Sequence, residues 1–400
     1  MSSQIRKLVV ICSLLIFAFV AVGHVLGRSA DDKAFRALTV YSEVLEYIQR
    51  QYVDDPDMHQ VTSGALHGLM DSLDPESSYM SPLEYADYKE KSASTPKAQA
   101  GLVLTKRLGY ISVVATLPDS PAQKAGLELG DVLEKIAGFT TGQMGIEQAQ
   151  LLVSGEPGTV VKLSVIRRTK AEPQDMSLTL EPLAAPKLAE DKIAGDVAYL
   201  RVPEFSQGMS QKIREKLAQF QQQGAHKLIL DLRDCAYGDD QEGIATAQLF
   251  VGSGTITSLK GQTIGSVVST ADSGNVAWNA PVSVLIGNST AGAAEIVASA
   301  IADNHRGETV GDRTYGTASM QKLIQLDDGS ALILTVANYY TPAGKEIPLE
   351  GVVPTHPVRS ALTDLSIDAP LPAPSSSMDD PVVKAALEIL QSAGAAQKAA

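Results

Sequence analysis

The stretch that decides the fold of the carboxy-terminal half is residues 284–296, which read VLIGNSTAGAAEI. Its last residues open a run, 293–302, that predicts a helix. Earlier in the chain, the apolar residues 228–230 predict a buried strand, and residues 243–250 predict another helix. Strands at 197–202 and 331–336 and a helix at 211–222 extend the pattern. This alternation of strands and helices is typical of an α/β layered core.

Residues 284–296 resemble, without a gap, the nucleophile segment VLVNEGSASASEI of the carboxy-terminal processing (tail-specific) serine peptidases. The serine that attacks the peptide bond in that family corresponds to Gly292. The resemblance continues through residues 311–321, GDRTYGTASMQ, against the family's GEKTFGKGSVQ. The general-base lysine corresponds to Thr317, whereas the family's glutamine is retained as Gln321. The resemblance therefore implies a catalytically degenerate member.

Both replacements remove groups that the reaction needs. A serine attacks only when a neighbouring base accepts its proton, and a buried lysine can be that base. Gly292 has no side chain that could attack, and Thr317 has no basic lone pair. Loss of the nucleophile alone lowers turnover by about 10⁶-fold in a serine protease. We therefore expect a pseudopeptidase.

A third departure lies after the predicted strand at 227–233. The family continues with NNPGG, a turn whose backbone N–H groups face the developing oxyanion, whereas this chain reads DCAYG over residues 234–238. The resemblance places Tyr237 and Gly238 at the oxyanion-loop positions. Tyr237 adds bulk where glycine permits close approach of the substrate, and neighbouring aspartates add negative charge. A degraded oxyanion hole is predicted.

The alternative is an active serine endopeptidase whose Ser/Lys dyad has moved. The candidate nucleophiles are Ser289, Ser299 and Ser319, with Lys322 as the base. A nucleophile and its base must lie within hydrogen-bonding distance. Lys322 follows Gln321 on a predicted strand, where alternation turns the two side chains to opposite faces.

Residues 119–133, DSPAQKAGLELGDVL, resemble a PDZ domain of the bacterial protease type, and the resemblance extends over about residues 97–183. Gly126 and Gly130 stand where tight turns require glycine. PDZ domains bind an extended peptide as an added strand and hold its terminal carboxylate with backbone N–H groups. The resemblance places the peptide-binding residues in the loop at 98–104, at Gly101, Leu102, Val103 and Leu104. A PDZ fold kept only as a spacer is the alternative.

The amino terminus predicts export. Arg6 and Lys7 precede an apolar run over residues 8–22, which is typical of a signal peptide. Without cleavage, the apolar stretch to Leu26 could anchor the chain in the inner membrane, with the remainder exported. We therefore expect a periplasmic or cell-envelope protein that contacts the membrane only through this segment.

Charge and cysteine content exclude several classes of function. The net charge of −13 disfavours nucleic acid as a partner. Of the two cysteines, Cys12 lies in the export segment, so Cys235 has no disulfide partner in a mature chain. The scattered histidines form no zinc motif, and we expect neither a metal nor a cofactor.

The predicted protein is multidomain, with α+β and α/β parts. Residues 1–28 form the signal peptide or anchor, 29–95 a helical region, 96–184 the PDZ domain, 185–365 the α/β layered (ClpP/crotonase-like) peptidase core, and 366–400 a linker and helix. In the helical region, residues 73–82 read LDPESSYMSP, resemble the family's LDPHSSYLTP, and predict a capped turn that begins a helix. The helix at 381–392 could pack back onto the body or mediate self-association. Expected partners are protein carboxy-terminal tails, with an active paralogous peptidase as a further candidate.

Overall fold

The computed structural model describes residues 36–94, 96–107, 109–167, 170–184, 187–358 and 379–399. The predicted leader at 1–28 lies outside these residues. Among the described helices, none is both long enough and apolar enough to cross a bilayer. The chain divides into two units, Met1–Ala65 and Leu66–Ala400. The first unit contains a helix over residues 36–51 and the start of α2 (Met58–Asp71).

The second unit opens with β1 (Ser78–Met80) and α3 (Pro82–Ser92). The predicted helix start is confirmed, because Ser81 caps α3. The Ser81 hydroxyl accepts from Glu84 N (3.4 Å), and Glu84 Oε2 accepts from Ser81 N (2.7 Å). The strand β1 was not predicted. Three residues carry no periodicity, and the pairing comes from the distant β18 (Ala331–Tyr340), antiparallel to β1.

A six-stranded antiparallel sheet forms the PDZ domain. Its main order is β3-β4-β5-β8-β9, which leaves β3 (Leu102–Arg107) at an edge, and β6 pairs with β5. The helix α5 (Ile146–Leu152) packs against β3. Gly126 and Gly130 adopt the positive φ angles, 70° and 88°, that their turns require. The remaining elements are β2 (Ala98–Gln99), β4 (Tyr110–Thr116), α4 (Pro121–Lys124), β5 (Val132–Ile136), β6 (Phe139–Thr140), β7 (Ser154–Gly155), β8 (Val160–Arg167) and β9 (Lys170–Thr179).

The predicted α/β core contains a six-stranded sheet in the order β10-β11-β12-β15-β16-β19. In this sheet β11, β12, β15, β16 and β19 run parallel to one another, whereas β10 is antiparallel to β11. Both faces of such a parallel sheet are covered, which explains its apolar sequence. The strands are β10 (Ala189–Ala194), β11 (Val197–Arg201), β12 (Lys227–Asp231), β15 (Val282–Ile286), β16 (Gly307–Gly311) and β19 (His356–Pro357).

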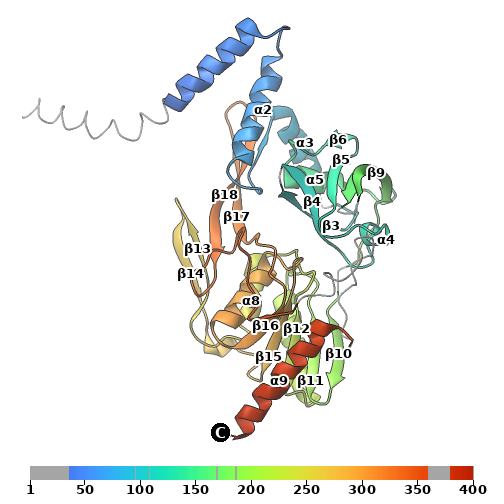
Figure 1. The fold of residues 1–400 in the computed structure, drawn as a ribbon, viewed down its shortest axis with the longest axis vertical. Helices are drawn as coiled ribbons and strands as arrows, with labels where there is room; N and C mark the ends of the chain where they lie inside the picture. The colour runs from blue at the N-terminus through green and yellow to red at the C-terminus, as the bar shows by residue number, and fades with distance from the viewer. Residues whose placement is uncertain are drawn as a thin grey trace, which may run out of the picture. The chain divides into compact units, whose positions relative to one another are not determined.

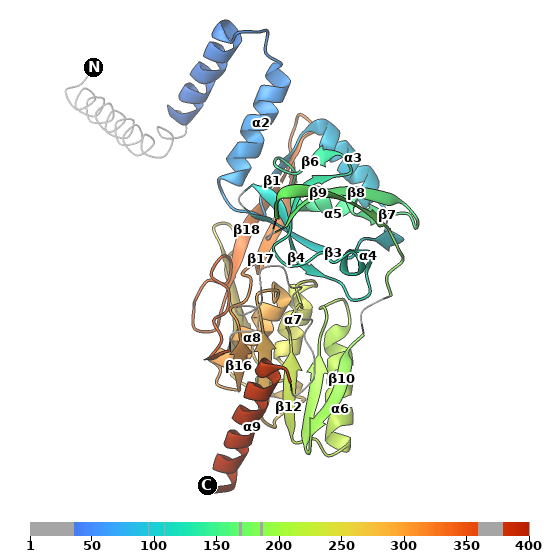
Figure 2. The same ribbon diagram turned by 45° about the vertical axis from the view of Figure 1, so that its right-hand side comes forward.

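Helices cover this sheet on opposite faces. Alternate side chains of β11 point to opposite faces of the sheet. Ala198 and Leu200 pack with α6 (Met209–Gln222) and α8 (Ala293–Asp303). Tyr199 packs with α9 (Pro381–Ala399) on the other face. The helix α7 (Asp240–Ala247) lies beside α8. Figures 1 and 2 show α9, in red, running alongside the sheet strands.

The predicted carboxy-terminal helix packs back onto the body. Its buried face packs against the side of the sheet that α8 does not cover. This face consists of Val382, Val383, Ala386, Leu387 and Leu390. This helix is longer than the predicted 381–392.

A second sheet supports the loops near residue 292. Its order is β1-β18-β13-β14, and β17 also pairs with β18. The bounds are β13 (Thr255–Gly261), β14 (Gly265–Thr270) and β17 (Ser319–Gln325), with a short 3-10 helix η1 (Ser273–Asn275) before β15. The β17–β18 hairpin follows directly on the loop that carries Thr317.

Candidate functional site

Gly292 lies at the amino-terminal cap of α8 in an unusual backbone conformation. Its φ and ψ angles are 58° and −121°, which residues with a side chain rarely adopt. A Cβ atom built on Gly292 would meet no other heavy atom within 4 Å. The space for a side chain is therefore open rather than filled by neighbouring packing.

A buried carboxylate joins Gly292 and Thr317, the two positions that the resemblance assigns to the family's catalytic residues. Glu295 Oε2 accepts hydrogen bonds from Gly292 N and from Thr317 N, each at 2.9 Å. Its Oε1 accepts from Gly316 N (2.7 Å) and from the Thr314 hydroxyl. Burial raises the pKa of Glu295 to about 7, against the lowering effect of these hydrogen bonds. Sequence reasoning missed Glu295, although a glutamate three residues after a helix cap is the capping-box signal.

Thr317 and Gln321 lie close together through Ser319. The Ser319 hydroxyl donates to Thr317 O (3.3 Å) and accepts from Gln321 Nε2 (2.7 Å). The retained glutamine is therefore bound to Ser319, at the start of β17.

The three alternative serines have partners other than lysine. The Ser289 side chain bonds to the Asp234 carboxyl group, and the Ser299 hydroxyl donates to Ile296 O (3.2 Å) inside α8. Lys322 is exposed on β17. Within the described residues, no hydrogen bond joins Lys322 to any of the three serines. Cys235 is no substitute nucleophile, because complete burial raises the pKa of its thiol well above the usual value.

The turn at 234–238 is fixed against the segment that follows β11. Phe205 N donates to Tyr237 O (2.9 Å), and Asp239 N donates to Phe205 O (2.8 Å). Gly238 has a φ of 139°, and a Cβ atom there would lie 2.5 Å from the Phe205 backbone. Only glycine fits this close approach. Tyr237 is 59% exposed.

Acidic groups lie near Gly292. Burial first, and then the charges of Asp239 and Glu295, raise the pKa of Asp240 to about 7. The helices α7 and α8 touch closely, since a Cβ atom on Gly243 would lie 2.7 Å from Ala293 O. As the pH rises through neutrality, Asp240 and Glu295 add negative charge to this site, which disfavours an oxyanion.

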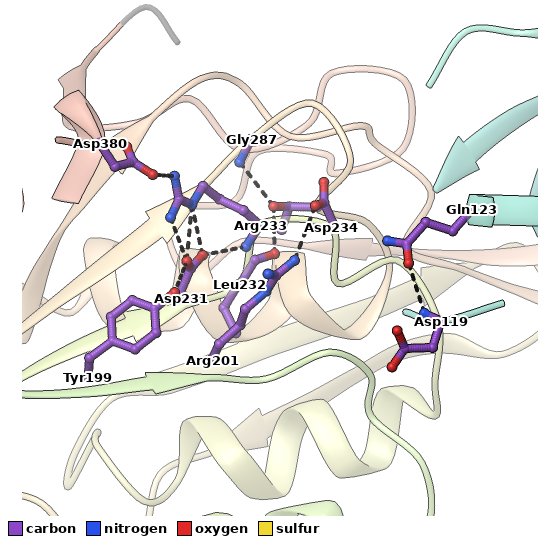
Figure 3. Close-up of polar contacts among 11 residues, drawn as sticks. Asp119, Gln123, Tyr199, Arg201, Asp231, Leu232, Arg233, Asp234, Gly287 and Asp380 are labelled. Atoms are coloured by element: carbon purple, nitrogen blue, oxygen red, sulfur yellow. Dashed lines mark hydrogen bonds and ion pairs between the residues drawn. The ribbon is translucent and has the colours of Figure 1, made fainter. Parts of the chain in front are cut away.

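Arg233 connects the strand before the turn to the carboxy-terminal helix (Figure 3). Its guanidinium donates to Asp231 through Nε (3.0 Å) and Nη2 (2.7 Å), and through Nη1 to Asp380 Oδ2 (2.6 Å). The Tyr199 hydroxyl donates to Asp231 Oδ2 (2.6 Å). Asp234, which follows Arg233 in the chain, pairs through Oδ2 with Arg201 Nη2 (3.2 Å). These bonds fix the end of β12 and the start of the 234–238 turn.

The predicted tail-binding loop lies at the free edge of the PDZ sheet. Gly101 has a φ of 76°, and a Cβ atom there would lie 2.2 Å from Ser120 Cβ. Ser120 is itself fixed as the cap of α4, and the preceding Asp119 N donates to Gln123 Oε1 (2.8 Å; Figure 3). Leu102 and Leu104 are buried and Val103 is half-buried. The edge strand and α5 thus flank the predicted site.

Comparisons with known proteins identify the family. Residues 196–358 match the model of peptidase family S41, and residues 112–167 match that of the PDZ domain. The chain is 30% identical over 354 residues to a carboxyl-terminal-processing protease of Synechocystis sp., covering 86% of this chain and 80% of the relative. The chain belongs to peptidase family S41.

Other comparisons agree with the S41 assignment. A carboxy-terminal-processing protease of Bartonella bacilliformis is 28% identical over 376 residues, covering 92% of this chain and 84% of the relative. The solved structure of a photosystem II D1 C-terminal processing protease has the same fold, with a TM-score of 0.66 at 24% identity over 80% of this chain and 92% of that one. The predicted S41 and PDZ folds are thereby confirmed.

Proposed function

We propose that this S41 member is an exported pseudopeptidase, which binds protein carboxy-terminal tails through its PDZ domain and does not cleave them. The observation that carries the proposal is Gly292 at the cap of α8, where the family's nucleophilic serine would stand. Export rests on the apolar run at 8–22 that follows Arg6 and Lys7.

The surroundings of Gly292 support the absence of cleavage. Glu295 holds the backbones of Gly292 and Thr317 together, yet neither residue supplies a nucleophile or a base. The nearby serines bond to a carboxyl group or to backbone carbonyls, and the Cys235 thiol is buried. The hydrogen bonds that hold the two loops together are thus present, whereas a nucleophile and a base are absent from Gly292 and Thr317.

The PDZ edge supports tail binding. A peptide that adds as a strand needs an unpaired strand edge, which β3 offers, and a pocket for its side chains. Apolar residues of β3 and α5 pack together in the core of the domain beside this edge, so we expect tails that end in apolar residues.

The test is to incubate the purified protein with an unstructured polypeptide that ends in apolar residues. We expect saturable binding that is lost when the terminal carboxylate is amidated, and no cleavage over hours. Cleavage abolished by Ser289→Ala or Lys322→Ala would instead establish the relocated dyad and overturn the proposal.

The binding site is tested by a matched pair of glycine variants. Gly101→Ala should abolish tail binding, because its Cβ would collide with Ser120. Gly109→Ala is the control, since Gly109 also has a positive φ (81°) but open space around it. Circular dichroism would verify that both variants are folded. Binding unchanged by Gly101→Ala would place the tail elsewhere.

A further inference from the structure

The strand β14 forms a free edge of the second sheet. It pairs with β13 along one side, where Val267 lies opposite Leu259, and it ends the strand order β1-β18-β13-β14. Figure 1 shows the β13–β14 hairpin, in yellow, at the outer side of this sheet. The main-chain groups on the other side of β14 therefore face away from the sheet and can accept a further strand.

Both faces of β14 are open as well. Val267 and Val268 follow each other in the strand, so their side chains point to opposite faces of the sheet. They are 52% and 51% exposed, whereas their partners on β13, Leu259 and Ser258, are each 8% exposed. The buried core therefore ends at β13, and β14 extends beyond it with apolar side chains uncovered.

The edge formed by β14 carries no charge. Residues 261–271, GQTIGSVVSTA, contain no aspartate, glutamate, lysine or arginine. Charged residues on an edge strand prevent the addition of further strands. In the described part of the chain, the other edge strands of five or more residues each carry at least one charged residue, namely Lys106 in β3, Lys170 in β9, Glu190 in β10 and Lys322 in β17. Among these described edges, β14 alone lacks this protection.

The absence of charge favours a second copy of this chain as the partner. Two copies with a net charge of −13 repel each other, except where a neutral surface allows close approach. In an antiparallel pair of identical strands related by a two-fold axis, residues of β14 lie opposite residues of β14. Like charges directly opposite each other destabilise such a pair, and β14 has none. A different protein recognised by its charge would instead require charged residues on this edge.

We propose that β14 pairs antiparallel with β14 of a second copy, so that the second sheet continues from one copy into the other. Val267 and Val268 then become neighbours of the same residues in the other copy. Strands of six residues bury less surface than a standard stable interface, so the dissociation constant is on the order of 10 µM. This dimer does not depend on tail binding by the PDZ domain.

Sedimentation velocity of the full-length protein between about 1 and 200 µM tests the dimer, because this range spans the expected dissociation constant. The mass should rise from that of a monomer to that of a dimer across the range. Val268→Lys should weaken dimerisation at least about tenfold, since it places like charges at the shared edge. Val268 is half exposed, so the variant should fold, and circular dichroism verifies this.

The same substitution elsewhere provides the matched control. Val160, in β8, is 57% exposed, and β8 lies between β5 and β9 inside the PDZ sheet. Val160→Lys should therefore keep the dissociation constant of the wild type. Equal constants for the wild type and Val268→Lys, or a wild type that stays monomeric at every concentration, would overturn the proposal.

Complementary charges test whether the partner is an identical copy. Val268→Glu alone should dimerise as poorly as Val268→Lys, whereas an equimolar mixture of the two variants should dimerise again, because opposite charges then meet across the shared edge. A mixture that associates no better than either variant would contradict pairing between two copies of β14. Hydrogen exchange provides the remaining check, since slower exchange of the β14 amides only after addition of a different protein would assign the edge to that partner and overturn the proposal.

Discussion

Gly292 and Thr317 donate their backbone N–H groups to the same atom, Oε2 of Glu295, over 2.9 Å each. The two positions that the resemblance assigns to the nucleophile and the base are thus joined by one buried carboxylate. We infer that Glu295 maintains the shape of the loops.

Replacement of Glu295 by alanine should destabilise the protein by about 4 kcal/mol, because several buried donors would lose their acceptor. Glu295→Gln keeps the volume and part of the hydrogen bonding, so it should cost about half as much. Urea unfolding at pH 6 measures both values. Equal stability of Glu295→Ala and the wild type would contradict the structural role.

Glu295 should also contribute to the pH dependence of unfolding. Its folded pKa of about 7 exceeds the ordinary value of 4.5, so the folded state holds a proton that the unfolded state has released in this window. The stability from this group is present at low pH and is lost as the pH rises towards 7. The free energy of unfolding should therefore fall less steeply between pH 5 and 7 in Glu295→Gln than in the wild type, and parallel curves would exclude the effect.

A side chain at position 292 should be sterically tolerated but conformationally strained. Gly292→Ala and Gly292→Ser should each lower stability by about 1–2 kcal/mol, since the backbone conformation is unfavourable for both while the space is open. Thermal unfolding measures the two losses. A much larger loss for serine than for alanine would reveal a collision that the open space does not predict.

Restoration of the two family side chains should not restore activity by itself. Gly292→Ser with Thr317→Lys should cleave a tail substrate little above background, because Tyr237 and the acidic groups oppose an oxyanion. Adding Tyr237→Gly should raise the rate. Full activity from the double variant alone would show that the 234–238 turn is still competent.

The carboxy-terminal helix should contribute to the stability of the core. Leu387→Ala should cost about 3 kcal/mol, because Leu387 is buried between α9 and the sheet. Its neighbour Glu388 is exposed, and Glu388→Ala should change stability by less than about 0.5 kcal/mol. Similar values for the two variants, measured by urea unfolding, would mean that α9 detaches in solution.

The local sequence predicted those helices and strands whose apolar pattern is continuous. The apolar residues 228–230 lie in β12, and the predicted helix at 293–302 agrees with α8 to within one residue. The predicted helix at 243–250 was misplaced by three residues at each end, because Asp239 caps α7 and the chain leaves the helix after Ala247. Capping by a side chain, rather than apolar spacing, determined that start.

The sequence alone did not predict the polar contacts between residues that lie far apart in the chain. Arg233 meets Asp380 only because distant parts of the chain fold together. The resemblance assigns the nucleophile and base positions to Gly292 and Thr317, but their common acceptor became visible only with the hydrogen bonds of Glu295. Such contacts depend on three-dimensional placement, for which periodicity carries no signal.

The complete burial of Cys235 makes it an internal reporter. A maleimide can react with this thiol only while the core around the 234–238 turn is transiently open, so its alkylation rate measures that opening directly. Mass spectrometry of the peptide that contains Cys235 separates this reaction from that of Cys12. Slower alkylation in the presence of a tail peptide would reveal that occupancy of the PDZ domain tightens the distant peptidase core.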